Sequence, residues 1–364
     1  MRLSNFTFLL WASLCLLCSG IGCSNSSTYE PLWNPPQQTD PEEPEEPDDV
    51  SFVVYNHLAD SPDVNVSTVW EVTLSQNGVE KECMVFQSTC PVYDSSKGMI
   101  GSDRTALELV AGRTISWANF SFDGEVTVTA RILDPSRVPM SSSVAVYPSR
   151  KHVSPSLSGQ SVTFTLTEPG QYSVEVGADG YRNGLMIFAN PLEKDAPKSD
   201  DAAYRRVENA TAADMAALPA DRSGIYFARG VHDIGKYIVP AHVKNIYIPG
   251  DAYVYGTLVV ENNPGVRIFG RGTLSAARLP YRASHSIEAT GDSNGMVVEG
   301  ITIADFTHFS VRLITTNNRV EWVKTIGAWT YNCDGISVFH YSTVKNCFIW
   351  ANDDSIKVYR DGIT

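Results

Sequence analysis

Hydrophobic and polar residues alternate along the chain in two patterns that differ in their spacing. From Val50 to about Pro191, short alternating runs are separated by turn residues, as in Glu125–Ala130 (EVTVTA) and Ser161–Leu166 (SVTFTL). Alternation with a period of two places every second side chain on one face of a strand. Many short strands of this kind between turns predict an antiparallel β-sandwich over residues 50–191.

Beyond Gly224 the hydrophobic pattern repeats. Valine opens a similar segment five times, at Val243, Val266, Val298, Val320 and Val344. The spacings are 23, 32, 22 and 24 residues, and the long one predicts a loop insertion within Ala276–Asn294. A second track with a similar period passes through Val311, Ile336 and Ile356.

Two strand tracks that share a period of about 23 residues define one coil of a parallel β-helix, in which each coil buries its apolar face against the next. We therefore predict a right-handed parallel β-helix over residues 224–364. The ladder of Leu and Asn that a leucine-rich repeat needs is absent, and a propeller blade needs about twice this period. The chain ends ten residues after Asp354, which predicts that this β-helix is incomplete at its C-terminal end.

The remaining segments differ in composition from these two regions. Residues 192–223 are rich in Lys, Asp and Ala and are predicted to form a linker with a short helix. Residues 24–49 hold Ser, Asn, Pro and acidic residues with almost nothing to bury, which predicts a disordered acidic tether. Residues 1–23 contain an apolar run too short to span a bilayer, as in a signal peptide.

The end of this leader, Gly20–Cys23, is similar to a bacterial lipobox but lacks the usual Leu. Lipid attachment at Cys23 and plain cleavage by a signal peptidase both remain open. Either route delivers the protein outside the cytoplasm, so we expect an extracellular or cell-surface location.

Charge and cysteine content narrow the function further. The net charge is −13, but seven of the carboxylates lie within residues 40–49. No basic stripe is present for a phosphate backbone, which argues against nucleic acid as a partner.

Four cysteines lie beyond the leader, at Cys83, Cys90, Cys333 and Cys347. Their spacing does not match a zinc site, so we expect a disulfide or buried thiols and no metal or cofactor.

Two acidic motifs lie on the second track: NCDGI from Asn332 and NDDSIK from Asn352. Aligning Ile336 with Ile356 places Asp334 level with Asp354 on the neighbouring coil. Parallel strands lie about 4.8 Å apart, so these carboxylates and that of Asp353 must crowd together.

Crowding of like charges raises at least one pKa, which provides the protonated acid and ionised base that glycoside hydrolysis needs. The alternative is that the acids only cap turns, since Asp-Gly and Asn-Asp are common turn pairs. Three carboxylates that converge across coils favour function, because Asn or Ser would cap a turn without the repulsion.

The blocks NCDGISV and NDDSIKVY, whose first acids are 19 residues apart, resemble those of glycoside hydrolase family 49, the dextranase and isopullulanase family. The segments GIYFARGV from Gly224, AYVYGT from Ala252 and GRGTLS from Gly270 extend the resemblance over roughly residues 120–360. It implies a β-sandwich followed by a right-handed parallel β-helix, and an inverting hydrolysis of an α-glucan. It further implies Asp353 as the general acid, with Asp334 and Asp354 holding the water as base.

Aromatic and polar residues around the acids are candidates for contact with substrate. Sugar rings stack on aromatic faces, and a lysine can donate a hydrogen bond to a sugar hydroxyl or orient a carboxylate. For the aromatics, packing between coils is an equally good interpretation. The predicted substrate-binding residues are Asn332, Asn352, Lys357, Trp329 and Tyr359.

The sequence therefore predicts a secreted glycoside hydrolase, an endo-acting enzyme on a dextran- or pullulan-like α-glucan, that acts as a monomer. One alternative is a hydrolase or lyase of another polysaccharide on the same scaffold. The polygalacturonase family shares the paired aspartates, but its later Gly-His-Gly and Arg-x-Lys elements do not follow Asp354. The other alternative is a glycan-binding β-helix without catalysis.

Overall fold

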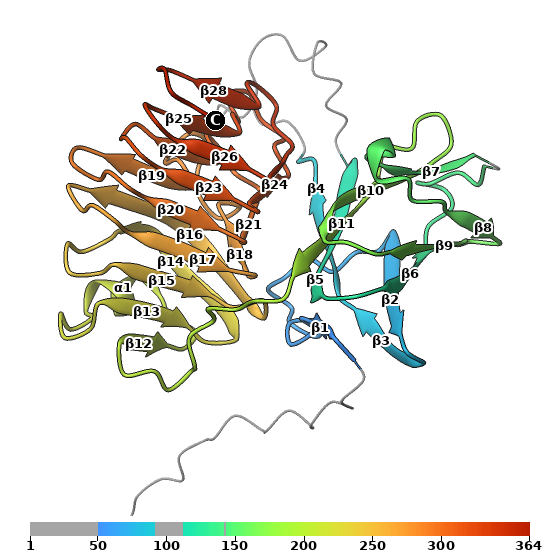
Figure 1. Cartoon of the computed structure of the whole chain (residues 1–364), viewed down its shortest axis with the longest axis horizontal. Helices are drawn as coiled ribbons and strands as arrows, with labels where there is room; N and C mark the ends of the chain where they lie inside the picture. Colours follow the sequence, from blue (N-terminus) through green and yellow to red (C-terminus); the bar gives the residue numbers. More distant parts are fainter. Residues whose placement is uncertain (1–49, 92–111, 142) are drawn as a thin grey trace, which may run out of the picture. The chain divides into compact units, whose positions relative to one another are not determined.

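The computed structural model describes residues 50–91, 112–141 and 143–364. These residues are almost entirely strands and turns (Figure 1), with one five-residue helix, α1 (Ala212–Ala216), and one 3-10 turn, η3 (Ser149–Lys151). The predicted signal peptide, Cys23 and the acidic tether all lie outside the described residues. Within the described ranges, no helix is long and apolar enough to cross a bilayer.

The N-terminal region forms the two sheets of a β-sandwich. The larger sheet contains β1 (Phe52–Val54), β4 (Val85–Thr89), β5 (Thr114–Phe122), β7 (Val144–Tyr147), β10 (Gly170–Val176) and β11 (Leu185–Pro191). The smaller sheet contains β2 (Trp70–Gln76), β3 (Val79–Cys83), β6 (Val126–Ile132), β8 (Ser156–Ser158) and β9 (Ser161–Leu166). The two runs singled out in the sequence become β6 and β9, which pair antiparallel as predicted.

One pair in the larger sheet differs from the expected antiparallel arrangement, because β11 runs parallel to β5. Alternation of side chains does not depend on strand direction, so the sequence pattern could not distinguish the two. Every residue of β5 is buried, which shows that both of its faces are covered. Cys83 and Cys90 are free, buried thiols.

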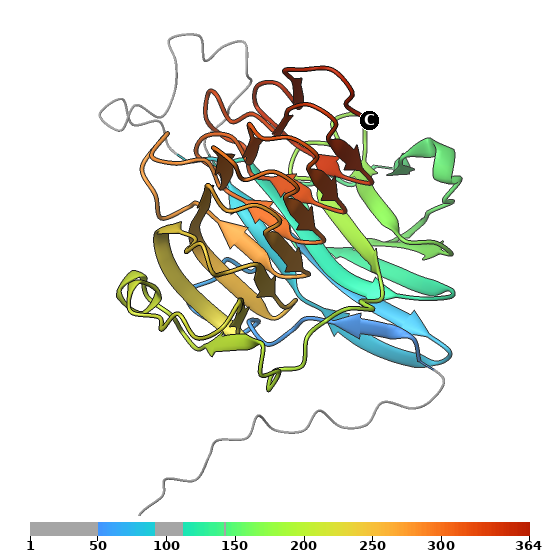
Figure 2. The same cartoon turned by 60° about the vertical axis from the view of Figure 1, so that its left-hand side comes forward.

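The C-terminal region is a right-handed parallel β-helix with three walls, whose stacked coils Figure 2 shows from a second direction. The first wall contains β12 (Tyr204–Val207), β13 (Gly224–Phe227), β15 (Asn245–Ile248), β17 (Arg267–Gly270), β20 (Val297–Glu299), β23 (Arg319–Glu321) and β26 (Thr343–Lys345). All of its strand pairs are parallel.

The second and third walls are joined by the long strands β14 (Gly230–Ile238) and β16 (Ala252–Glu261). The second wall continues with β18 (Thr273–Ser275), β21 (Thr302–Ala304), β24 (Lys324–Ile326) and β27 (Phe348–Ile349). The third wall continues with β19 (Ile287–Thr290), β22 (Val311–Leu313), β25 (Ile336–Val338) and β28 (Ile356–Val358).

The repeat register is confirmed on the second track, where Val311 pairs with Ile336 and Ile336 with Ile356. On the first track Val298, Val320 and Val344 are in register, but Ile246 and Ile268, rather than Val243 and Val266, occupy the equivalent positions in the earlier coils. Both valines are also buried in the solenoid core. Apolar residues at neighbouring inward positions therefore made the register ambiguous.

The segment 192–223 was predicted to be a linker and is only partly one. It contains β12, which pairs with β13 and opens the first wall, so the solenoid begins about twenty residues before Gly224. The strand was not predicted because its sequence YRRV lacks the Val and Ile pattern of the later coils. The expected short helix is present as α1, which begins after Thr211 with a capping box to Asp214.

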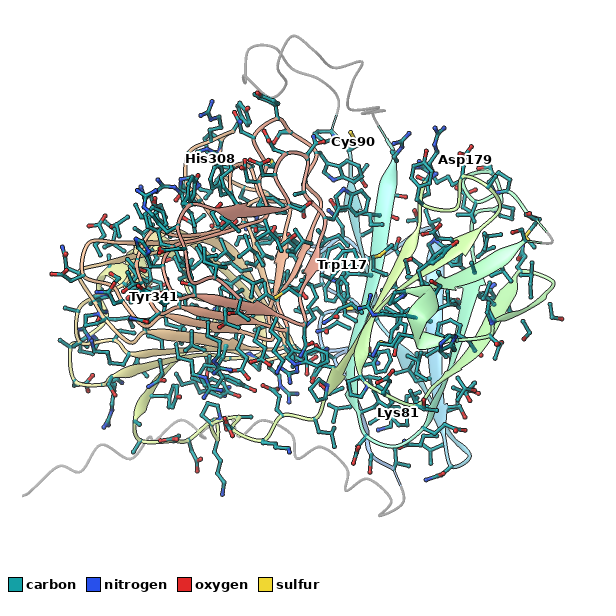
Figure 3. The ribbon with its side chains drawn as sticks, turned by 45° about the horizontal axis from the view of Figure 1, so that its top comes forward. Lys81, Cys90, Trp117, Asp179, His308 and Tyr341 are labelled. Carbon is teal, nitrogen blue, oxygen red and sulfur yellow. The ribbon has the colours of Figure 1, made fainter. Side chains whose placement is uncertain are left out.

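The sandwich packs directly on the second wall of the solenoid. Phe86, Trp117 and Phe188 of the sandwich share a buried cluster with Tyr253 and Ile326 of the solenoid. The Trp117 and Phe86 rings stack with centroids 5.3 Å apart, and Figure 3 labels Trp117 within this region. This contact explains why β5 is buried on both faces.

We expect the change Trp117→Ala to destabilise the chain by about 3–5 kcal/mol, because it leaves a large cavity in this cluster. Chemical denaturation followed by fluorescence and circular dichroism would measure the loss. Tyr181→Ala is a matched control, since Tyr181 is 48% exposed. A loss at Trp117 no larger than at Tyr181 would show that the cluster adds little to stability.

Candidate active site

The coil stacking brings the three predicted aspartates together at the corner between the second and third walls. Asp334 and Asp354 each lie two residues before a strand of the third wall, β25 and β28, whose first residues are paired. The backbone N–H of Gly335 donates to the carbonyl of Asp354 at 2.9 Å. One carboxylate oxygen from each of Asp334, Asp353 and Asp354 lies within 4.8 Å of the others.

Glycine is required next to Asp334 because the coils approach closely at that point. A β-carbon on Gly335 would lie 2.2 Å from the carbonyl oxygen of Ser355, and no real contact is that short. The Asp-Gly pair therefore serves the stacking of the coils as well as the placement of a carboxylate. The turn interpretation and the functional interpretation of this motif are compatible.

Asp334 is the buried member of the cluster, with no exposed surface. It forms an ion pair with Lys357, and Oδ1 has no hydrogen-bond partner among the described residues. Burial raises the pKa of Asp334, the ion pair with Lys357 opposes that rise, and the charges of Asp353 and Asp354 add to it. The expected pKa rise therefore falls on Asp334, with burial as its main cause and like-charge crowding as a smaller one.

Lys357 bridges two of the three carboxylates. Its Nζ lies 2.8 Å from Oδ2 of Asp354 and also contacts Asp334. Burial would lower the pKa of Lys357, but its hydrogen bonds to Asp334 and Asp354 raise it above the ordinary value. The lysine is therefore charged at neutral pH and favours the ionised form of Asp334.

Asp353 differs from its neighbours because no ion pair is recorded for it within the described ranges. It is exposed, its Oδ2 accepts a hydrogen bond from Nδ2 of Asn332 at 3.2 Å, and its Oδ1 accepts one from the backbone N–H of Asp354 at 2.9 Å. Asn332 adopts a left-handed conformation with φ of 60°, which asparagine tolerates well. Asn332 thus positions an acid of the cluster.

The other residues predicted to contact substrate, Asn352, Trp329 and Tyr359, lie in three different environments. Asn352 donates from Nδ2 to the carbonyl of Thr330 at 3.3 Å and so holds two turns together. Trp329 is only 6% exposed and donates from Nε1 to Ser88 of the sandwich at 2.6 Å. Its predicted role as a platform for sugar does not fit this burial, because the indole packs in the contact between sandwich and solenoid. Tyr359 is 36% exposed beside Phe339 and remains a candidate.

A row of aromatic side chains that was not predicted from the sequence continues from the aspartates along the same corner. His285 and Phe309 occupy the positions equivalent to Asp334 and Asp354 in earlier coils. His308, labelled in Figure 3, stacks on His285 with ring centroids 4.1 Å apart. Lys357 lies 4.9 Å from the ring centre of Phe309. Extending the second-track alignment toward the N-terminus would have found this row.

We expect the stacked histidine pair to make stability depend on pH. Burial lowers the pKa of His285 to about 3 and that of His308 to about 4, with positive neighbours adding to both shifts. Between pH 6.5 and 4 the unfolded chain binds protons at these sites and the folded chain does not, so the folded state loses stability as pH falls. Denaturation at several pH values should show a shallower acid loss for His285→Gln with His308→Gln. An unchanged pH dependence in that double variant would contradict the assignment.

The three carboxylates could also attract a cation. Lys357, however, already lies between Asp334 and Asp354 and would repel a metal ion at the same oxygens. The cluster therefore combines one buried carboxylate with one carboxylate that lacks an ion pair among the described residues, an arrangement that could carry out acid–base chemistry.

Comparison with known proteins finds relatives that are named dextranase and isopullulanase. A dextranase from Arthrobacter globiformis is 23% identical over 374 residues, covering 84% of this chain and 58% of the relative. An isopullulanase from Aspergillus niger is 22% identical over 315 residues, covering 75% of this chain and 55% of the relative. The chain thus spans less than three fifths of the length of these relatives. No protein-family profile matches it.

The fold is shared with Dex49A from Penicillium minioluteum at a TM-score of 0.68 and 19% identity. The match covers 82% of this chain and 65% of that one. The predicted resemblance to dextranases and isopullulanases is therefore confirmed, and so is the predicted fold class.

Proposed function

We propose that this chain carries the catalytic site of a glycoside hydrolase that cleaves an α-glucan such as dextran or pullulan. One observation carries the proposal: Lys357 pairs with Asp334 and Asp354 but not with Asp353. Hydrolysis needs one carboxyl group that holds a proton and another that does not. The names of the relatives supply the substrate class.

The lysine divides the roles among the three acids. Lys357 favours the ionised form of Asp334 and also contacts Asp354, and these two carboxylates together orient a water molecule as the general base. Asp353, exposed and without a cation, donates its proton to the glycosidic oxygen.

We further propose that the reaction inverts the anomeric centre. Inverting enzymes usually hold their carboxyl groups about 6.5 to 9.5 Å apart, farther than the cluster here. Among the described residues, the side chain of Asp353 has one hydrogen bond to another side chain, so rotation of its carboxyl group can widen the gap when a sugar binds. Two of the three acids are exposed, which suits attack within a long chain rather than only at its ends.

The proposal also includes export and a monomeric state. The apolar run before Cys23 would direct the chain out of the cytoplasm, with or without a lipid on that cysteine.

The change Asp353→Asn should lower kcat on dextran or pullulan by roughly 10²–10⁴-fold, because asparagine cannot donate the proton. Release of reducing ends from dextran, pullulan and polygalacturonate measures both the loss and the substrate class. Proton NMR of the first products should show the β-anomer if the reaction inverts. Unchanged release by the variant would exclude Asp353 as the acid, and polygalacturonate cleavage alone would exclude the α-glucan.

The change Lys357→Gln should shift the acid limb of the kcat/KM profile to higher pH. Without the cation, the pKa of Asp334 rises further above its ordinary value, so the base is protonated over a wider range. The profile should be compared with that of Lys345→Gln, whose lysine lies 3.7 Å from Glu321 on the first wall. A lower rate with an unmoved acid limb would show that Lys357 only supports the local fold.

A further inference from the structure

A second hollow lies on the outer side of the solenoid, at the corner between the first and second walls. Its volume is about 370 Å³, within the range of pockets that hold small ligands, about 300–1,000 Å³. One side is formed by residues 191–196, which leave the sandwich, and the other by the outer face of β17, β20 and β23. The aspartates lie at the opposite edge of the second wall, so this hollow is separate from the catalytic corner.

Trp322 lines the hollow in a backbone conformation that disfavours it. Four successive coils turn here with a positive φ, and the register aligns Trp322 with Gly270, Gly300 and Asn346. The φ values are 131° and 80° for the glycines, 53° for Asn346 and 56° for Trp322. Glycine and asparagine adopt this conformation readily, whereas tryptophan is rarely found in it. The turn itself therefore gives no reason for a tryptophan.

The indole of Trp322 is also free of the contacts that would explain it as packing. It is partly exposed, and within the described ranges it makes no ring stacking and no side-chain hydrogen bond. The other aromatic ring of the hollow, Phe269, is covered by the guanidinium of Arg267 at 3.9 Å. Trp322 is thus a partly exposed aromatic residue in the lining of the hollow, with no ring or hydrogen-bond partner among the described residues.

The charges around the hollow cancel. Four basic and four acidic residues line it: Lys194, Arg267, Arg271 and Arg319 with Glu193, Asp195, Glu299 and Glu321. Most of them are already paired, with Arg319 at 2.7 Å from Glu321 and 3.4 Å from Glu299, and Arg267 at 3.2 Å from Glu299. A balanced lining offers many hydrogen-bond donors and acceptors but attracts neither anions nor cations.

We propose that this hollow is a second, non-catalytic binding site for a neutral polysaccharide chain. A sugar ring stacks on Trp322, and its hydroxyl groups exchange hydrogen bonds with Arg319 and Glu321. The choice of an α-glucan rests on the function proposed above, whereas the neutral ligand and its aromatic contact do not. A polymer held at this site stays near the aspartates, which raises its effective concentration there.

The test uses the full chain carrying Asp353→Asn, so that binding is measured without cleavage. Native electrophoresis through gels containing dextran or pullulan should retard this protein. Adding Trp322→Asn should weaken the retardation about tenfold in apparent Kd, as for loss of a central aromatic contact. Glu321→Gln, which changes a charge of the hollow and leaves the indole, should weaken it to a smaller extent. Tyr341→Ala, which removes an aromatic residue that is 63% exposed outside the hollow, should not change it.

Thermal unfolding separates binding from packing. Asparagine suits the positive φ, so Trp322→Asn should unfold at the same or a higher temperature than its parent. In the active chain, the same change should raise KM for the polymer and leave kcat and the cleavage of a trisaccharide fragment unaltered.

Retardation equal to the parent's in both Trp322→Asn and Glu321→Gln would overturn the site, as would a marked fall in Tm for Trp322→Asn. If the active chain releases no reducing ends but Trp322→Asn still abolishes retardation, the proposed hydrolysis fails and the binding site stands.

Discussion

The spacing of stacked coils is the constraint on which the rest of this structure depends. Parallel pairing of Ile336 with Ile356 fixes the two preceding aspartates at the same height on adjacent coils. The chain cannot separate them without breaking the backbone hydrogen bonds that join the coils. The repulsion between the carboxylates is instead reduced by Lys357. This lysine belongs to β28, the strand that follows Asp354, and lies between the carboxylates of Asp334 and Asp354. Stacking of the coils thus brings like charges together. The charge of Lys357 offsets those of Asp334 and Asp354 more than that of Asp353.

Much of this arrangement could be predicted from the sequence. Val311, Ile336 and Ile356 occupy equivalent positions on successive coils, so aligning Ile336 with Ile356 was enough to bring three aspartates together. The first track was harder, because Val243 and Val266 are as apolar and as buried as the isoleucines that hold the register. The strand β12 was missed for the opposite reason, since arginines occupy positions where later coils have apolar residues.

Other features depend on contacts between segments distant in sequence. Trp329 is close to the acids along the chain, yet its indole N–H donates a hydrogen bond to Ser88 of the sandwich. No local sequence pattern predicts that contact. The unequal partners of the aspartates likewise depend on the direction of one lysine side chain. Local sequence thus located the acidic cluster, while the division of roles within it required the three-dimensional positions.

Because the acids and their lysine come from two neighbouring coils, the proposed chemistry is confined to one junction of a linear stack. The aromatic row formed by His285, His308 and Phe309 belongs to the coils on one side of that junction. Coils farther away contribute only to the surface along which a long substrate would lie. Evolution can therefore change the surface that would contact the substrate by altering, adding or removing one coil at a time. The two coils that carry the aspartates and Lys357 keep the same geometry.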